Sequence, residues 1–252
     1  MLDLKDKVAV ITGSGQGIGR AFALSLAQNG AKVVIVDIKA ENVNNVVKEI
    51  KDQGGEVLGV TASVAVEEDC LRVARECQSK LGKIDVLVNN ASIFSTIKMK
   101  SFLEISEKEW DDLMAVNVKG IFLMCKAAVP YMKEQNWGRI INITSTTFFQ
   151  GRPNYLHYVT SKGGVIGLTR ALAREVGDFG ITANAVAPGA TMTEVPRDTV
   201  SPEQAVKIIS RRCIKRAQEP RDLVGIVNFL ASEEAGFISG QTIVADGGSD
   251  MN

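Results

Sequence analysis

The sequence predicts an α/β protein folded as one doubly wound domain, with a mostly parallel seven-stranded sheet and helices on both faces. Short runs rich in β-branched residues alternate with longer helical patterns along the whole chain. Several of the short runs are almost continuously apolar, which is typical of strands covered on both faces. The 252 residues contain no linker rich in Pro, Gly or Ser, so we expect a single domain over residues 1–252.

The predicted strands and helices alternate along the chain. The predicted strands are short runs rich in β-branched residues: Lys7–Thr12, Lys32–Asp37, Glu56–Thr61, Ile84–Asn89, Arg139–Thr144, Ile181–Ala187 and Thr242–Asp246. The helices share longer mixed patterns: Arg20–Gln28, Ala40–Gln53, Glu67–Lys80, Glu107–Gln135 and His157–Phe179. Residues 190–220 interrupt this rhythm as a long polar segment before the last strand, and we predict that they form a substrate-binding lid.

Composition narrows the class of protein. The 29 basic residues balance the 29 acidic ones, so the net charge does not point to nucleic acid or an anionic membrane. The chain starts without a signal-peptide layout, and no apolar run reaches the roughly 20 residues that span a bilayer. We therefore expect a cytoplasmic protein without a metal site, because it has a single histidine and its cysteines lack metal-ligand spacing: Cys70, Cys77, Cys125 and Cys213.

A glycine-rich loop joins the first strand to the first helix. In "VITGSGQGIGR" the glycines are Gly13, Gly15, Gly17 and Gly19, a spacing that differs from the literal G-x-G-x-x-G fingerprint. Residues without side chains let the backbone turn tightly and approach a pyrophosphate at a helix N-terminus. The loop therefore predicts a dinucleotide site, the alternative being a plain strand-to-helix turn.

Asp37 at the end of the second strand indicates which dinucleotide binds. It follows the loop by about 20 residues, where a carboxylate can accept hydrogen bonds from the adenosine ribose. The same carboxylate would repel a 2′-phosphate, and Lys39 is the only nearby cation. We predict NAD (NADH) as the cofactor. The alternative role for Asp37 is a turn cap.

The stretch "HYVTSK" places Tyr158 and Lys162 four residues apart, on one face of a predicted helix. A free phenol has a pKa near 10, too high for a base at neutral pH. A nearby ammonium favours the phenolate and lowers that pKa. The pair predicts a general acid-base tyrosine, the alternative being a packed tyrosine beside a solvated lysine.

Two further polar residues complete a candidate catalytic set. Ser145 ends the fifth strand, where a hydroxyl can donate to developing negative charge on a substrate oxygen. Asn117 lies within a long helical pattern, where asparagine is unfavourable and can mark a local distortion that admits water. The alternatives are a strand-end hydroxyl that satisfies the backbone and a core asparagine.

The glycine loop, "NNAS" at Asn89–Ser92, Ser145, the Tyr158/Lys162 pair and "PGATMT" at Pro188–Thr193 occur here in one order. Together they resemble the short-chain dehydrogenase/reductase family over essentially the whole chain. The resemblance implies a Rossmann fold, hydride transfer with a nicotinamide cofactor, and Tyr158 as acid and base. It also implies that Lys162 bonds the nicotinamide ribose and that Asn117 holds a proton-relay water.

The resemblance also implies a set of cofactor contacts along the chain. These are Gly13, Ser14, Gln16, Gly17, Ile18, Gly19, Asp37, Ile38, Ser63, Val64, Asn89, Asn90, Ala91, Tyr158, Lys162, Pro188, Gly189, Thr191 and Thr193. Two positions depart from the family pattern. Ser92 replaces a common glycine after "NNA", and Ser63 replaces the aspartate that meets the adenine amino group.

The residues expected to face the substrate lie in three stretches around the reacting carbon: Ser92, Phe94, Ser145, Thr147, Phe148, Tyr155, Tyr158 and Met192. Their apolar and aromatic character suits a hydrophobic or aryl carbonyl, although Phe148 is equally compatible with the core or a subunit contact. We expect His157 at the surface or an interface. The stretch around Tyr158 is similar to bacterial 1-phenylethanol dehydrogenases, and "NNASIF" resembles pyridoxal 4-dehydrogenase.

The sequence thus predicts an NAD-dependent oxidoreductase that interconverts a secondary alcohol and a ketone, or a primary alcohol and an aldehyde. One alternative is a 3-oxoacyl-carrier-protein reductase, which usually uses NADPH. A more distant one is a dinucleotide-sensing regulator without catalysis. Because two predicted helices are apolar on several faces, and because family members commonly form tetramers, we expect a homotetramer.

Overall fold

The computed structural model describes residues 4–196 and 202–251, and within them seven strands form one parallel sheet. Their order in the sheet is β3-β2-β1-β4-β5-β6-β7, so the strand order reverses between β1 and β4. The predicted doubly wound α/β domain is confirmed. The strands are β1 (Val8–Thr12), β2 (Lys32–Asp37), β3 (Val57–Thr61), β4 (Val86–Asn89), β5 (Gly138–Ile143), β6 (Ile181–Pro188) and β7 (Thr242–Ala245).

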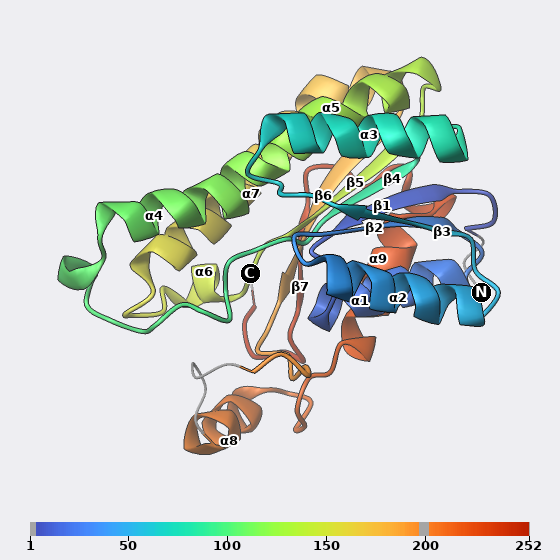
Figure 1. The fold of residues 1–252 in the computed structure, drawn as a ribbon. Helices are drawn as coiled ribbons and strands as arrows, with labels where there is room; N and C mark the ends of the chain where they lie inside the picture. The colour runs from blue at the N-terminus through green and yellow to red at the C-terminus, as the bar shows by residue number, and fades with distance from the viewer. Residues whose placement is uncertain (1–3, 197–201, 252) are drawn as a thin grey trace.

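Helices cover both faces of the sheet, as Figure 1 shows. One face packs against α3 (Glu67–Leu81), α5 (Gly120–Glu134) and α7 (Leu156–Val176). The other face packs against α1 (Gly17–Gln28), α2 (Ala40–Asp52) and α9 (Arg221–Leu230). The sheet is therefore buried on both sides, which explains why its strands read as continuous apolar runs.

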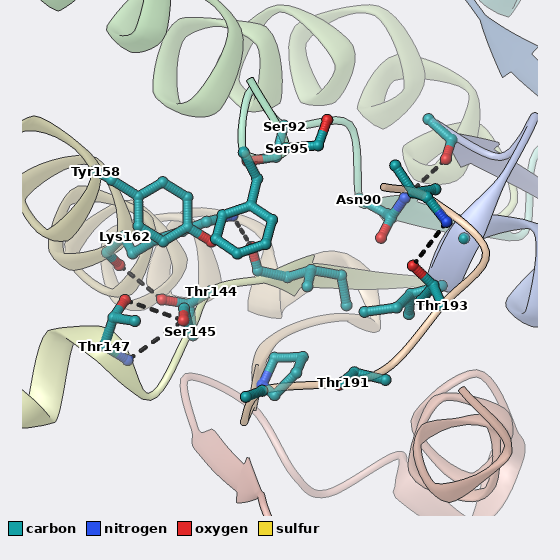
Figure 2. Close-up of a pocket in the computed structure, with 18 of the residues that line it drawn as sticks. Asn90, Ser92, Ser95, Thr144, Ser145, Thr147, Tyr158, Lys162, Thr191 and Thr193 are labelled. Atoms are coloured by element: carbon teal, nitrogen blue, oxygen red, sulfur yellow. Dashed lines mark hydrogen bonds between the residues drawn. The ribbon is translucent and has the colours of Figure 1, made fainter. Parts of the chain in front are cut away.

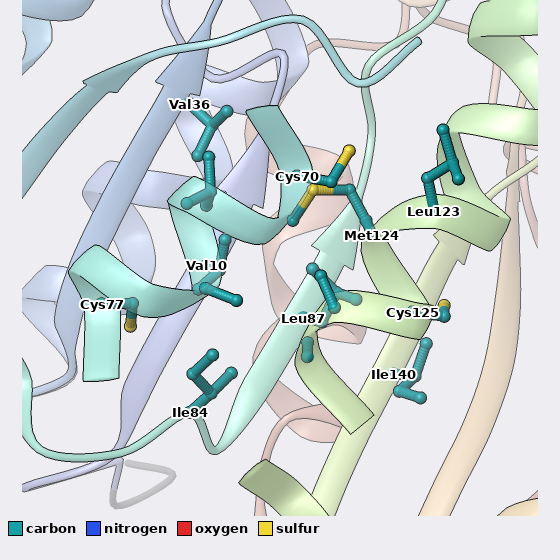
Figure 3. Packing of buried hydrophobic residues seen from close by; sticks show 14 of the residues in the cluster. Val10, Val36, Cys70, Cys77, Ile84, Leu87, Leu123, Met124, Cys125 and Ile140 are labelled. Carbon is teal, nitrogen blue, oxygen red and sulfur yellow. The ribbon is translucent and has the colours of Figure 1, made fainter. Parts of the chain in front are cut away.

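The core beneath α3 and α5 contains three of the four cysteines (Figure 3). Cys70, Cys77 and Cys125 are free thiols buried among aliphatic side chains, whereas Cys213 is exposed. Burial raises the pKa of Cys70 to about 11 and the pKa of Cys125 to about 12. The buried thiols therefore stay protonated and act as small apolar core residues.

The predicted helix Glu107–Gln135 is divided into three parts. It consists of α4 (Glu107–Met114), a π-helical turn at Ala115–Lys119, and α5. The distortion lies at Asn117, where the sequence predicted one. The whole run Glu107–Glu134 is long and apolar enough to cross a membrane, but half of its most apolar window is buried inside the protein.

The segment between β6 and β7 contains α8 (Pro202–Arg211), which lies apart from the layers, beyond the carboxyl ends of the strands (Figure 1). Residues 197–201 of the predicted lid lie outside the described residues. A parallel bridge between Thr191 and Gln218 and a hydrogen bond from the Met192 amide to the Gln218 carbonyl join the two ends of this segment.

Candidate active site

A cavity of about 750 Å³ opens at the carboxyl ends of β1, β2, β4, β5 and β6. Its walls come from the loops that follow these strands, together with α7 and α8. The reversal of strand order between β1 and β4 separates the loops there, which is why doubly wound sheets bind ligands at this point. The fold therefore brings residues that are far apart in the sequence into one site.

Different structural constraints require glycine at different positions of the first loop. Gly13 and Gly17 both have φ of +61°, a left-handed conformation that side chains disfavour. A Cβ on Gly13 would also lie 2.7 Å from the Ala91 Cα, and one on Gly19 would collide with the Gly13 carbonyl. The loop thus packs tightly against β4 and leaves the start of α1 open to the cavity.

The first amide of α1 already has an acidic partner. Gly17 N donates to the Glu194 carboxylate at 2.8 Å, although the two residues are 177 positions apart. Gln16, the residue that precedes α1, makes no side-chain cap. The amides at a helix N-terminus attract anions, so Glu194 lies where a pyrophosphate oxygen would be favoured.

Asp37 lies at the opposite end of the cavity from Tyr158 along the sheet order. Its carboxylate accepts from the backbone amides of Gly15 and Lys39, each at 3.1 Å, and it lines the cavity. A Cβ on Gly15 would approach the Asp37 carboxylate to 2.9 Å. The glycine loop therefore supports the carboxylate that the sequence assigned to the ribose.

Ser145 is held so that its own hydroxyl proton remains available. Its Oγ accepts two hydrogen bonds, from the Thr147 amide at 3.2 Å and from the Thr147 hydroxyl at 3.0 Å (Figure 2). A hydroxyl has two acceptor sites and one donor. With both acceptor sites used, the Ser145 O–H can donate into the cavity, which is the arrangement needed beside a carbonyl oxygen.

Tyr158 and Lys162 face the same part of the cavity as Ser145 (Figure 2). The Lys162 ammonium lies 5.6 Å from the centre of the Tyr158 ring and donates to the Ile143 carbonyl at 2.9 Å. Lys162 is 3% exposed and forms no ion pair within the described ranges. Burial without a counter-charge lowers the pKa of Lys162 from 10.5 to about 7.

Asn117 connects the π-helical turn to α7 near Tyr158 and to the loop after β4. Its Oδ1 accepts from the Ile93 amide at 2.8 Å and its Nδ2 donates to the Ser161 hydroxyl at 3.1 Å. Ser161 in turn donates to the Tyr158 carbonyl at 2.8 Å. Asn117 is fully buried beneath the cavity, and its neighbour Val116 lines the cavity wall.

Most of the predicted cofactor residues line this single cavity: Gly13, Gln16, Gly17, Ile18, Gly19, Asp37, Ile38, Ser63, Val64, Asn90, Ala91, Tyr158, Lys162, Pro188, Gly189, Thr191 and Thr193. Ser14 and Asn89 do not. The Ser14 hydroxyl donates to the Ile11 carbonyl and accepts from the Val36 amide. Asn89 is 2% exposed and donates to Asn142, so both side chains brace the sheet.

Of the residues predicted to face the substrate, some line the cavity and others lie outside its lining. Ser92, Phe94, Ser145, Thr147 and Tyr158 line the cavity.

Phe148, Tyr155 and Met192 are not among the residues that line it, so their contact with a substrate stays a prediction. Tyr155 is fully buried with its ring edge against Tyr158, and Phe148 is 40% exposed with its ring 2.7 Å from where a Cβ on Gly163 would lie. Met192 is half-exposed and borders a smaller pocket. His157, expected at the surface or an interface, is 3% exposed in the single chain and is also outside the lining.

Several lining residues were not predicted from the sequence. They come from the turn after Ser145, from α8 and from the C-terminal segment: Gln150, Arg152, Pro153, Gln204, Lys207, Ile208, Arg211, Asp246 and Ser249. The spacing of the α8 residues marks one helical face and was a usable signal. These α8 residues lie within the predicted lid, residues 190–220, but nothing local in the sequence specified which face of the helix turns toward the cavity.

The comparisons with known proteins agree with this geometry. A family model described as enoyl-(acyl carrier protein) reductase matches residues 13–250. A 3-oxoacyl-[acyl-carrier-protein] reductase of Staphylococcus epidermidis is 39% identical over 247 residues, covering 98% of this chain and all of that protein.

The chain belongs to the short-chain dehydrogenase/reductase family. Solved structures of the family superpose closely. A Sinorhizobium meliloti protein classed as a short-chain alcohol dehydrogenase has a TM-score of 0.93 at 33% identity, covering 98% of this chain and 97% of its own. Levodione reductase has a TM-score of 0.91 at 31% identity, with coverage of 96% and 97%.

Membership makes the protein an oxidoreductase that uses a nicotinamide dinucleotide, NAD(P). The residues present fit such a group. Asp37 and Tyr158 both line the cavity, and Gly13 and Gly17 add no side chain of their own beside the start of α1, where the Glu194 carboxylate accepts from the first amide. Within the described residues the buried Lys162 ammonium donates to the Ile143 carbonyl, and its other N–H donors leave capacity for ribose hydroxyls.

Proposed function

We propose that the protein interconverts a secondary alcohol and a ketone, or a primary alcohol and an aldehyde, with NAD(H). The observation that carries the proposal is the gathering of Ser145, Tyr158 and Lys162 around one end of the cavity, with the Ser145 hydroxyl free to donate. These side chains provide a hydrogen-bond donor, a proton-transfer group and a cation for one substrate oxygen.

Each of these residues has a separate role in the proposed reaction. In alcohol oxidation the Ser145 hydroxyl holds the substrate oxygen, and Tyr158 as phenolate accepts the hydroxyl proton. A nicotinamide dinucleotide held along the cavity would supply the two-electron hydride acceptor that converts the alcohol to a carbonyl. In reduction Tyr158 returns its proton to the oxygen as the hydride arrives, which balances charge in both directions.

Lys162 and Asn117 support the proton transfer. A protonated Lys162 near Tyr158 favours the phenolate through its charge. Asn117, in the π-helical turn, bonds Ser161 and the Ile93 backbone, and we assign it the site of a relay water between Lys162 and solvent. π-turns of this kind are frequent at functional sites.

Asp37 supports NAD rather than NADP. Its carboxylate is fixed by the Gly15 and Lys39 amides and faces the cavity, where it would accept from ribose hydroxyls and repel a 2′-phosphate. The substrate end is lined by Ile93, Phe94 and Val116, which favours a hydrophobic or aryl carbonyl.

The decisive test is Tyr158→Phe, with Tyr131→Phe as the matched control because Tyr131 does not line the cavity. We expect turnover of an aryl ketone such as acetophenone to fall by about 10²- to 10⁴-fold in Tyr158→Phe. NADH binding, followed by fluorescence, should persist. Retained turnover in Tyr158→Phe would exclude the mechanism, and a wild-type protein that binds NADH without any turnover would favour the dinucleotide-sensing regulator.

A second candidate function is reduction of a 3-oxoacyl thioester, which the 39% identical relative favours by its name. The Asp37 carboxylate weighs against it if that reaction depends on NADPH. Parallel assays with NADH and NADPH on aryl ketones, pyridoxal and a 3-oxoacyl thioester separate the two functions. Turnover of only the thioester would replace our proposal with the second function.

We also infer a homotetramer in the cytoplasm. Phe122 on α5 is 53% exposed and Leu156 at the start of α7 is 49% exposed, although both helices are apolar. Exposed apolar side chains on such helices suit a two-fold contact. Analytical ultracentrifugation at micromolar concentration tests the inference, and a monomer would contradict it.

A further inference from the structure

The face of α8 that lines the cavity carries two cations. Lys207 and Arg211 are four residues apart, so they lie one turn apart on the same face, with Ile208 beside them. Both side chains are exposed at the cavity wall, and neither forms an ion pair with a carboxylate of the described chain. Like charges at this spacing weaken a helix slightly. The repulsion between these two cations does not stabilise α8, so helix stability does not explain their placement.

A chain of contacts connects α8 to the substrate end of the cavity. The residues directly after α8 bond the C-terminal segment, through Cys213 N to the Gly248 carbonyl and Ile214 N to the Gly247 carbonyl. Asp250 of that segment accepts from Gln150 at 2.5 Å. Gln150 ends the short helix α6 (Thr147–Gln150), which begins at the residue that bonds Ser145.

The nearby carboxylates compensate these cations only in part, because Asp250 interacts electrostatically with Arg211 without forming an ion pair with it. Asp246 lines the cavity but is 3% exposed, and it accepts from the amides of Gly248, Ser249 and Asp250. Asp250 does not line the cavity. A third cation, Arg152, lines it from the turn after α6. The substrate end therefore combines an apolar wall with the two exposed cations of α8.

We propose that the physiological substrate carries an anionic group, a carboxylate or a phosphate, which Lys207 and Arg211 of α8 bind while Ser145 and Tyr158 hold its carbonyl. This inference rests on the proposed alcohol–ketone function and narrows its substrate class. An anion between two cations gains charge-assisted hydrogen bonds, and an apolar ring between anion and carbonyl would contact Ile93 and Phe94.

The test compares aryl methyl ketones whose para substituent is either anionic or neutral. The probes are 4-acetylbenzoate and 4-acetylphenyl phosphate, each against the neutral methyl 4-acetylbenzoate, with NADH held saturating. We expect at least one anion to be favoured in kcat/KM by on the order of tenfold. The preferred anion identifies carboxylate or phosphate as the source, and added salt should reduce the preference.

The variants are Lys207→Ala with Arg211→Ala, and Lys215→Ala as the control, because Lys215 is an exposed cation outside the cavity lining. We expect the double variant to lose the anion preference through KM and Lys215→Ala to keep it. Equal turnover of charged and neutral ketones by the wild type would overturn the inference. So would a double variant that loses NADH affinity but keeps the preference. Absence of turnover on every ketone would instead contradict the proposed function.

Discussion

Replacing Lys162 with methionine removes an ammonium that the fold buries without a counter-charge. The side chain is 3% exposed, and it donates a hydrogen bond to the Ile143 carbonyl at 2.9 Å. Burial lowers the pKa of Lys162 from 10.5 to about 7. Methionine has a similar length and no charge, so we expect Lys162→Met to unfold less readily than the wild type while losing activity.

The magnitude follows from proton linkage. The folded pKa lies below the unfolded one, so between pH 7 and 10.5 the unfolded chain holds a proton that the folded chain lacks. The free energy of unfolding of the wild type therefore rises with pH across this window, by up to about 1.36 kcal/mol per pH unit. The buried lysine costs the fold about 4 kcal/mol at pH 7 and about 2 kcal/mol at pH 9. Loss of the bond to Ile143 offsets about 1 kcal/mol of the gain in the variant.

Urea unfolding of unliganded wild type and Lys162→Met, at equal protein concentration and at pH 7 and 9, measures the effect. We expect the variant to be more stable by about 3 kcal/mol at pH 7, with a gain about 2 kcal/mol smaller at pH 9. Lys51→Met on the exposed face of α2 serves as control and should change little at either pH. A variant that is destabilised at pH 7, or a gain that does not depend on pH, would refute the reasoning.

Three further substitutions probe the site. Thr147→Val keeps the side-chain shape but removes the hydroxyl that bonds Ser145, so kcat should fall by about three- to tenfold with little change in NADH affinity; an unchanged kcat would contradict the positioning role. Glu194→Gln neutralises the carboxylate that accepts from the Gly17 amide, so we expect NADH titrations to show binding about two- to fivefold tighter. Weaker binding would mean that Glu194 assists the cofactor. Asp37→Ala should raise kcat/KM for NADPH relative to NADH by about tenfold or more, and an unaltered ratio would remove Asp37 from cofactor selection.

The sequence by itself determined the parts of this protein that depend on local periodicity. Most strands were visible as short, largely apolar runs because parallel strands covered on both faces carry few polar side chains. The spacing of Tyr158 and Lys162 placed them on one face of a helix, and Asn117 marked the π-helical turn. These features need no knowledge of distant residues.

Only the tertiary structure decided where side chains from remote segments point. It turned Tyr155 into the core, against the ring of Tyr158, and placed Glu194 on the Gly17 amide across 177 positions. It also directed the cationic face of α8 toward the cavity. The direction of a side chain on a helix or turn is set by how that element packs against others, and the pattern within the element specifies which residues share a face but not what that face meets.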